Sequence, residues 1–229
     1  MSLFIDPYNP NLKMMIKTLH PTPGYCFIVD IVGSTQMKDG KVGEWVESFR
    51  RTFAAIRKES SLEFSVMKSL GDALLLFLPS TTTGLIKPLD LVVRLTEIIR
   101  AGGSVKVRVG AAFCMDSFDI TFIPDTPDVY GKDIDLTARL VELADEGEIV
   151  MNNSFAQSAL RALARTSSEE FAWIKNQMVG PVAKKLKGFH QAVKVYRLRI
   201  PAGGKEIHSM INDSYRFKTE RRVAIVEPA

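Results

Sequence analysis

Two aspartates stand where apolar, strand-like runs end. Asp30 follows the apolar run 27–29, and Asp72 follows Gly71 between the apolar stretches 62–70 and 73–78. Gly71-Asp72 alone is a routine turn dipeptide. An aspartate buried like Asp30 is costly unless a cation or hydrogen-bond donors compensate its charge. Because both side chains can face one point at the end of a sheet, the pair predicts a site for divalent cations and a phosphate ligand.

Three small or polar residues follow Asp30 directly, at Gly33, Ser34 and Thr35. Backbone N–H groups in such a turn can approach phosphate oxygens before the next helix begins. The turn is therefore a candidate phosphate-binding segment beside the aspartate pair.

The pattern of apolar residues predicts the elements that must hold these side chains. Continuous or alternating apolar runs predict strands, and apolar residues at helical spacing predict helices. The Gly71-Asp72 spacer is of hairpin type. The predicted strands are 25–32, 62–70, 73–78, 105–115, 148–151, 182–186 and 193–200, and the predicted helices are 42–58, 89–100, 133–143 and 154–165.

The order of these elements, β-α-β-β-α-β, is typical of an α+β, ferredoxin-like (split βαβ) sheet, here with a C-terminal helix and hairpin extension. We expect an irregular N-terminal arm at 1–24, a catalytic domain at 25–200 and a basic tail at 201–229. A chain of 229 residues is long enough to form a core without disulfides.

Composition excludes several classes of protein. Hydrophobic residues make up 46% and charged residues 24%, as in globular chains, and the net charge of +4 is too small and too dispersed for a nucleic-acid stripe. The apolar run 73–78 is too short to span a bilayer, and the start of the chain does not resemble a signal peptide. We expect a cytoplasmic protein without nucleic-acid or membrane partners, in which Cys26 and Cys114 are buried free thiols.

Four ordered motifs resemble the class III nucleotidyl cyclases. The segment 27–35 resembles the first metal motif of that family, and 68–73 resembles the second. The segment 128–140 is similar to the family's base-and-ribose segment, and Lys187-Gly188 before strand 193–198 resembles its phosphate-binding lysine and closing strand. The resemblance spans residues 25–198. It implies a phosphorus–oxygen lyase that converts a nucleoside triphosphate to a 3′,5′-cyclic nucleotide and pyrophosphate in homodimers with shared active sites.

The resemblance also implies roles for individual residues. Two Mg²⁺ or Mn²⁺ ions would be bound by Asp30, Asp72 and the carbonyl of Ile31. The partner protomer would supply Lys68 and Asp128 to the base, Arg139 to the α-phosphate and Lys187 to the terminal phosphates. Asp135 stands at the position of the residue that places the ribose.

Some of these roles have simpler alternatives. Arg139 lies one helical turn after Asp135 and could form an ordinary intrahelical ion pair with it. Lys187 could be a solvated lysine in a lysine-rich run. The family usually has asparagine at the position of Asp135 and often tryptophan at that of Tyr130.

The residues do not determine which nucleobase is bound. Lys68 and Asp128 match the lysine–aspartate pair of ATP cyclases, yet one donor beside one acceptor also fits cytosine and uracil. A catalytic domain with only short arms resembles the pyrimidine (UTP or CTP) cyclases of bacterial antiphage defence, whose product a separate effector reads. We therefore favour a pyrimidine substrate, with ATP as the alternative.

Two other classes of protein remain to be weighed. A ferredoxin-like RNA-binding module would need exposed aromatic residues on its central strands, and Asp30 stands there instead. A cyclase homologue that binds nucleotide without turnover is the other alternative, because of Asp135.

Overall fold

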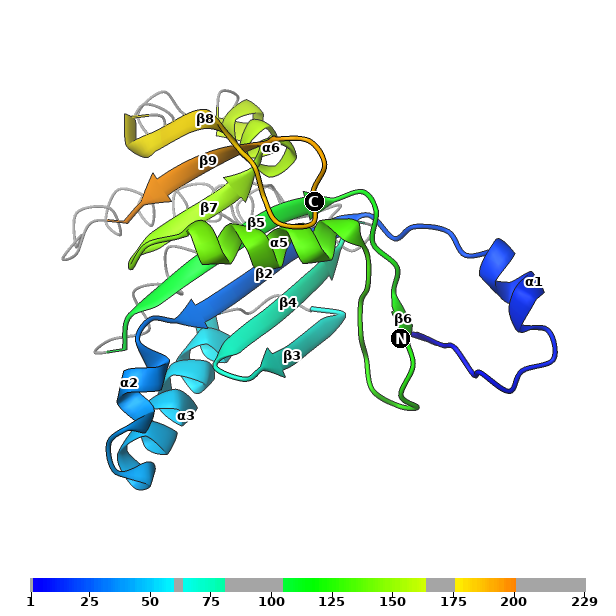
Figure 1. Cartoon of the computed structure of the whole chain (residues 1–229), viewed down its shortest axis with the longest axis horizontal. Coiled ribbons are helices and arrows are strands. Elements are labelled where there is room, and N and C mark those ends of the chain that lie inside the picture. Colours follow the sequence, from blue (N-terminus) through cyan, green and yellow to red (C-terminus); the bar gives the residue numbers. More distant parts are fainter. Residues whose placement is uncertain (1, 60–63, 81–104, 164–175, 201–229) are drawn as a thin grey trace, which may run out of the picture.

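A single mixed sheet organises the computed structural model, which describes residues 2–59, 64–80, 105–163 and 176–200 (Figure 1). Within these residues the strand order is β3-β4-β2-β5-β7-β9-β8, and β1 pairs with β6 in a separate two-stranded ribbon. The strands are β1 Leu3–Phe4, β2 Gly24–Ile31, β3 Val66–Leu70, β4 Ala73–Pro79, β5 Val107–Cys114, β6 Ile120–Thr121, β7 Glu148–Asn152, β8 Met178–Lys184 and β9 Val193–Arg199. The helices are α1 Leu12–Lys17, α2 Ser34–Lys38, α3 Val42–Glu59, α5 Lys132–Leu143 and α6 Asn153–Leu163.

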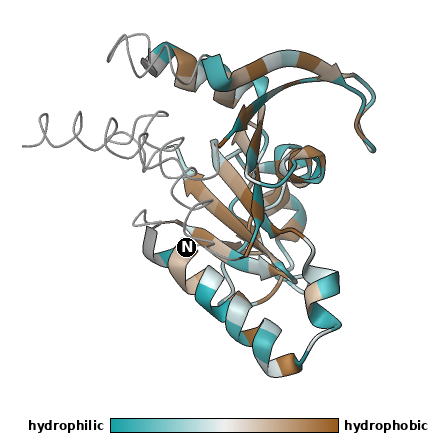
Figure 2. Cartoon of the chain, turned by 90° about the vertical axis from the view of Figure 1, so that its left-hand side faces the viewer, coloured by the Kyte–Doolittle hydropathy of each residue, from teal (hydrophilic) through white to brown (hydrophobic). Residues whose placement is uncertain are grey.

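The sheet separates two hydrophobic cores. Because successive side chains of a strand point to opposite faces, Phe27 and Val29 of β2 enter one core while Ile28 enters the other. The first core is completed by α3 and α6 and the second by α5, which Figure 1 shows lying across the sheet. Figure 2 shows the central strands as largely hydrophobic, as expected for strands covered on both faces.

Gly110 lets α5 approach β5 closely. A Cβ at this position would lie 2.6 Å from the carbonyl oxygen of Thr137 and 2.6 Å from the backbone nitrogen of Val141. A larger residue would therefore push α5 away from the sheet. The helix that carries Asp135 and Arg139 is thus fixed against the central strands.

The β3–β4 hairpin forms where the sequence predicts it. Leu70 pairs with Ala73, so Gly71 and Asp72 are the two turn residues, and Gly71 has a φ of +72°. Glycine adopts this left-handed conformation without the cost that a side chain adds. The turn places Asp72 at the same end of the sheet as Asp30, since Asp30 of β2 pairs with Ala73 of β4.

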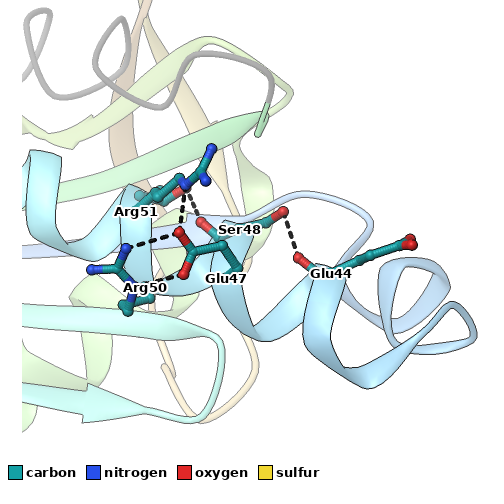
Figure 3. A network of polar contacts seen from close by, with 6 residues as sticks. Glu44, Glu47, Ser48, Arg50 and Arg51 are labelled. Atoms are coloured by element: carbon teal, nitrogen blue, oxygen red, sulfur yellow. Dashed lines mark hydrogen bonds and ion pairs between the residues drawn. The ribbon is translucent and has the colours of Figure 1, made fainter.

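The outer face of α3 carries a solvated ion-pair network (Figure 3). Glu47 accepts hydrogen bonds from Arg50 at 2.6 and 2.8 Å and from Arg51 at 2.6 Å, and Ser48 Oγ donates to the carbonyl of Glu44 at 2.9 Å. Hydrogen bonds from the two arginines lower the pKa of Glu47 to about 2. Since the pairs are exposed and screened by water, they contribute little to folding, which makes these residues suitable for control substitutions.

The α+β prediction is confirmed, with differences at element ends. Helices 42–58 and 133–143 and strands 25–32, 73–78, 105–115 and 148–151 form within three residues of their predicted bounds. The strand predicted at 62–70 begins only at Val66 among the described residues, and the one predicted at 182–186 runs instead from Met178 to Lys184. Predicted helix 89–100 and tail 201–229 lie outside the described residues. The boundaries of the domains stay a prediction.

The expectation of an irregular arm at 1–24 was wrong in part. Residues of this arm form β1 and α1, which lie beside the seven-stranded sheet (Figure 1). Elements of two and six residues are too short to show a periodicity that would predict them from the sequence. Strand β1 also depends on pairing with β6, which is distant in the chain. Cys26 and Cys114 are buried free thiols, as predicted. In the described residues no helix is long and apolar enough to cross a membrane.

Candidate active site

Asp30 lies near the end of β2 and is paired with an arginine that the sequence did not single out. Its carboxylate oxygen Oδ2 accepts a hydrogen bond from Nε of Arg108 at 2.8 Å and lies 2.7 Å from Nη2 of the same guanidinium in an ion pair. The two residues stand opposite each other on β2 and β5, and the Asp30 side chain is only 15% exposed. Arg108 thus supplies the compensation that a nearly buried carboxylate requires. Only the strand register reveals this partner.

Asp72 joins the same site from the hairpin. Ser34 Oγ donates a hydrogen bond to Asp72 Oδ2. This bond, followed by smaller effects that include the charges of Lys38 and Arg108, lowers the pKa of Asp72 below its ordinary value. Asp30 pairs with Ala73, the neighbour of Asp72, and Ser34 hydrogen-bonds Asp72, so the three residues lie at the same end of the sheet. Their role in metal binding stays a prediction.

The turn at 33–35, predicted to bind phosphate, has a definite shape and is followed by a short helix. Gly33 has a φ of +73° and precedes α2, which is five residues long. Gly33 and Thr35 are exposed, whereas Ser34 is buried at 6% exposure because its hydroxyl faces Asp72. The hydroxyl of Ser34 is therefore used to hydrogen-bond Asp72.

The donor set fits a magnesium or manganese site that is completed by substrate. Among the described residues no three His, Cys, Asp or Glu side chains gather into a metal cluster. Mg²⁺ is commonly held by one or two carboxylates together with waters and substrate phosphates, so two aspartates suffice. The side chain of Ile31 is buried in the core, which leaves its carbonyl as the group that could add a ligand.

The hydrogen bond between Ser34 and Asp72 predicts a pH-dependent stability. A carboxyl whose pKa is lowered in the folded state stabilises the fold above its unfolded pKa, near 3.8, and loses this contribution as the pH falls through the folded pKa. Ser34→Ala is expected to lower the free energy of unfolding by about 1 kcal/mol at pH 7 and by less at pH 3. Urea unfolding followed by circular dichroism at both pH values measures this difference.

Ser48→Ala provides the control for that measurement, because it also removes a hydroxyl hydrogen bond but has no titratable partner in it. Its effect should be the same at both pH values. A loss for Ser34→Ala that does not change with pH would contradict the assignment.

Lys68, Asp128 and Tyr130 form a second group, called here the Lys68 cluster. Lys68 Nζ is ion-paired with Asp128 Oδ1 and lies 5.5 Å from the centre of the Tyr130 ring. Asp128 Oδ1 also accepts a hydrogen bond from the Val129 N–H at 2.7 Å. Desolvation and, after it, a hydrogen bond with Asp128 raise the pKa of Tyr130. The structure thus pairs Lys68 with Asp128 and places Tyr130 beside them, and their assignment to the base stays a prediction.

The remaining predicted residues do not join either group within one protomer. Arg139 pairs with Glu142 at 2.5 Å, so the alternative of an ion pair with Asp135 was wrong. Glu142 lies one turn after Arg139 on α5, and its carboxylate, not that of Asp135, pairs with the guanidinium. Asp135 and Lys187 are exposed, and in the described part of the chain no hydrogen bond or ion pair connects them to Asp30, Asp72 or the Lys68 cluster.

Comparison with known proteins gives matches in structure alone. No family model and no curated protein matches the sequence. The guanylyl cyclase Cya2 superimposes with a TM-score of 0.64 at 15% identity over 82% of this chain and 97% of that one. The adenylyl cyclase CyaB from P. aeruginosa gives a TM-score of 0.58 at 17% identity over 79% of this chain and 95% of that one.

A third structure is the guanylate cyclase domain of RhGC from Catenaria anguillulae, which was solved in complex with GTP. It gives a TM-score of 0.57 at 14% identity over 79% of this chain and 98% of that one. The similarity thus extends over nearly the whole length of each matched chain. The chain has the α+β fold of class III adenylyl and guanylyl cyclase catalytic domains.

Proposed function

We propose that this protein is a nucleotide cyclase that converts a nucleoside triphosphate to a 3′,5′-cyclic nucleotide and pyrophosphate. The observation that carries the proposal is the placement of Asp30 and Asp72 at one end of two adjacent strands, in a chain with the cyclase fold. In the reaction the ribose 3′-oxygen forms a bond to the α-phosphorus, the bond to the bridging oxygen of the β-phosphate breaks, and the hydroxyl proton leaves to solvent.

Asp30 and Asp72 would hold two Mg²⁺ or Mn²⁺ ions, with the Ile31 carbonyl as a further ligand. When bound, the cations supply the charge that acidifies the 3′-hydroxyl and neutralises the leaving pyrophosphate. Ser34 orients Asp72 through its hydroxyl, and Arg108 holds Asp30 and limits the negative charge of the pair. The exposed turn at Gly33 and Thr35 lies beside these carboxylates and offers backbone N–H groups to phosphate oxygens.

The active site is completed by a second protomer in this proposal. Arg139 and Lys187 are the cations assigned to the phosphates, and both side chains reach solvent instead of the aspartates of their own chain. A homodimer would place Arg139, Asp135, Lys187 and the Lys68 cluster of one chain opposite the aspartates of the other. The exposure of Asp135 and Lys187 in the single chain supports that arrangement.

For the base we propose a pyrimidine, so that UTP or CTP is the substrate. Lys68 offers a donor and Asp128 an acceptor, which fits the edge of uracil or cytosine. The phenol ring of Tyr130 borders the pair at 5.5 Å from Lys68 Nζ, and a bulky ring at this position favours a base with one ring over a base with two. The same donor–acceptor pair fits adenine, and ATP is the alternative.

The test is a product assay with purified protein, Mn²⁺ and an equimolar mixture of the four ribonucleoside triphosphates. We expect a single dominant cyclic product by mass spectrometry, cUMP or cCMP, together with pyrophosphate. Dominant cAMP would replace the pyrimidine assignment by the ATP alternative. Binding of a triphosphate without any product would overturn the enzyme assignment in favour of an inactive binding protein.

We further propose that the product is a second messenger in antiphage defence, read by a separate cyclic-nucleotide effector. The support is the proposed pyrimidine substrate, because the pyrimidine cyclases that this family includes act in bacterial antiphage defence. Phage infection of cells that carry the protein and its neighbouring genes should raise the cyclic nucleotide, and Asp72→Asn should abolish the rise. Unchanged nucleotide levels during infection would refute this role.

A further inference from the structure

The side chain of Ser2 forms hydrogen bonds with both backbone polar groups of Asp128. Its hydroxyl donates a hydrogen bond to the Asp128 carbonyl at 3.0 Å and accepts one from the Asp128 N–H at 2.9 Å. The two residues are 126 positions apart in the chain. One side chain thus satisfies both backbone groups of a single distant residue, which fixes its backbone orientation.

Strand β1, which follows Ser2, holds Ser2 in this position by pairing with β6. In β1, the Leu3 N–H donates to the Asp119 carbonyl at 2.9 Å, and the Ile5 N–H donates to the Thr121 carbonyl at 2.8 Å. Next to β6, Phe118 and Tyr130 form a two-way bridge, with N–H to carbonyl distances of 2.7 and 3.0 Å. The segment that carries Asp128 and Tyr130 is therefore held by Ser2 at one end and by Phe118 at the other.

These backbone hydrogen bonds determine the position of the Asp128 carboxylate. The side chain is 14% exposed, and its Oδ1 atom meets both Lys68 Nζ and the Val129 N–H. The hydrogen bonds of Ser2 with Asp128 are to its backbone, so removal of the hydroxyl would keep both partners of the ion pair with Lys68 but would let the Asp128 carboxylate shift. A carboxylate that reads a base must be held to within about half an ångström to discriminate.

We infer that Ser2 is a positioning residue for base recognition, acting on the nucleobase through the backbone of Asp128. The inference rests on the proposed nucleotide cyclase function. It assigns the N-terminal segment that leads into β1 a part in substrate selection. A residue of this kind affects how well the correct base is bound and leaves the chemistry of the phosphate unchanged.

The test compares Ser2→Thr with Ser2→Val, two side chains of nearly equal shape of which only threonine keeps the hydroxyl. Any affinity tag follows residue 229, so that the residues before position 2 are the same in all proteins. Ser2→Val is expected to raise KM for the preferred triphosphate about three- to tenfold, with kcat within about twofold of wild type. Its preference over the next-best triphosphate should fall by a similar factor, and Ser2→Thr should restore both.

Ser48→Ala is the matched control, because it removes a serine hydroxyl bond to a backbone carbonyl on the distant outer face of α3. Equal melting temperatures of the variants establish that a change in KM is not partial unfolding. Equal KM and preference in Ser2→Val and Ser2→Thr would overturn the inference while the cyclase function stands, as would a loss confined to kcat. A wild-type protein that cyclises none of the four triphosphates would overturn both.

Discussion

Replacing Asp30 or Asp72 by asparagine is expected to lower kcat by about 1,000-fold or more, while the protein stays folded. Asparagine keeps the size of the side chain and one oxygen, so Arg108 and Ser34 retain an acceptor. What is lost is the negative charge that binds a divalent cation. A factor of 1,000 corresponds to about 4 kcal/mol, a plausible share for one ligand of a metal that stabilises developing charge.

Two measurements separate lost catalysis from lost folding. The first is the rate of cyclic product formation at saturating triphosphate and Mn²⁺. The second is the melting temperature with and without Mn²⁺. Addition of Mn²⁺ should raise the melting temperature of the wild type and not that of Asp30→Asn or Asp72→Asn, because only a cation bound to the folded state stabilises it.

Glu47→Gln is the control for loss of charge. Glu47 is likewise an acidic residue paired with arginine, but it lies on the outer face of α3 (Figure 3). Its replacement should leave both kcat and the Mn²⁺ effect unchanged. Retention of more than about a tenth of wild-type kcat in Asp30→Asn or Asp72→Asn would refute the metal assignment.

The second large effect is the recovery of activity when two inactive variants are mixed. Asp72→Asn and Arg139→Ala should each be inactive as homodimers, because in a shared site every active centre then lacks one group. In a twofold symmetric dimer half of the molecules in an equal mixture are heterodimers, and each has one intact centre. Activity should therefore return to about a quarter of the wild-type value.

The measurement is product formation after co-expression of the two variants in equal amounts and purification of all dimers together. The mixed dimer alone, isolated through two different tags, should have about half of the wild-type activity. Arg50→Ala is the control for Arg139→Ala, since both arginines form exposed ion pairs with a glutamate three positions away on a helix. It should stay active alone. If the mixture has no more activity than the sum of its parts, the active site lies within one protomer, and Arg139 does not serve a partner's substrate.

The sequence alone predicted the parts of the fold that depend on local patterns. Helix α3 follows from the spacing of its apolar residues, and the β3–β4 hairpin follows from Gly71-Asp72 between two apolar runs. These signals are local, so they survive without knowledge of any partner strand. The same signals put Asp30 and Asp72 at strand ends, and the pairing of β2 with β4 places them together.

Only the tertiary structure decided which side chains meet. Arg108 is one basic residue among many until the register sets it opposite Asp30, and Ser2 contacts a residue 126 positions away. Arg139 had two acidic neighbours at helical spacing, and the structure pairs it with Glu142. The physical reason is that residue types and periodicity determine elements, whereas a contact between distant residues depends on strand register and on the packing of the whole chain. The sequence thus determined that two carboxylates end neighbouring strands, and the tertiary structure decided what holds each of them.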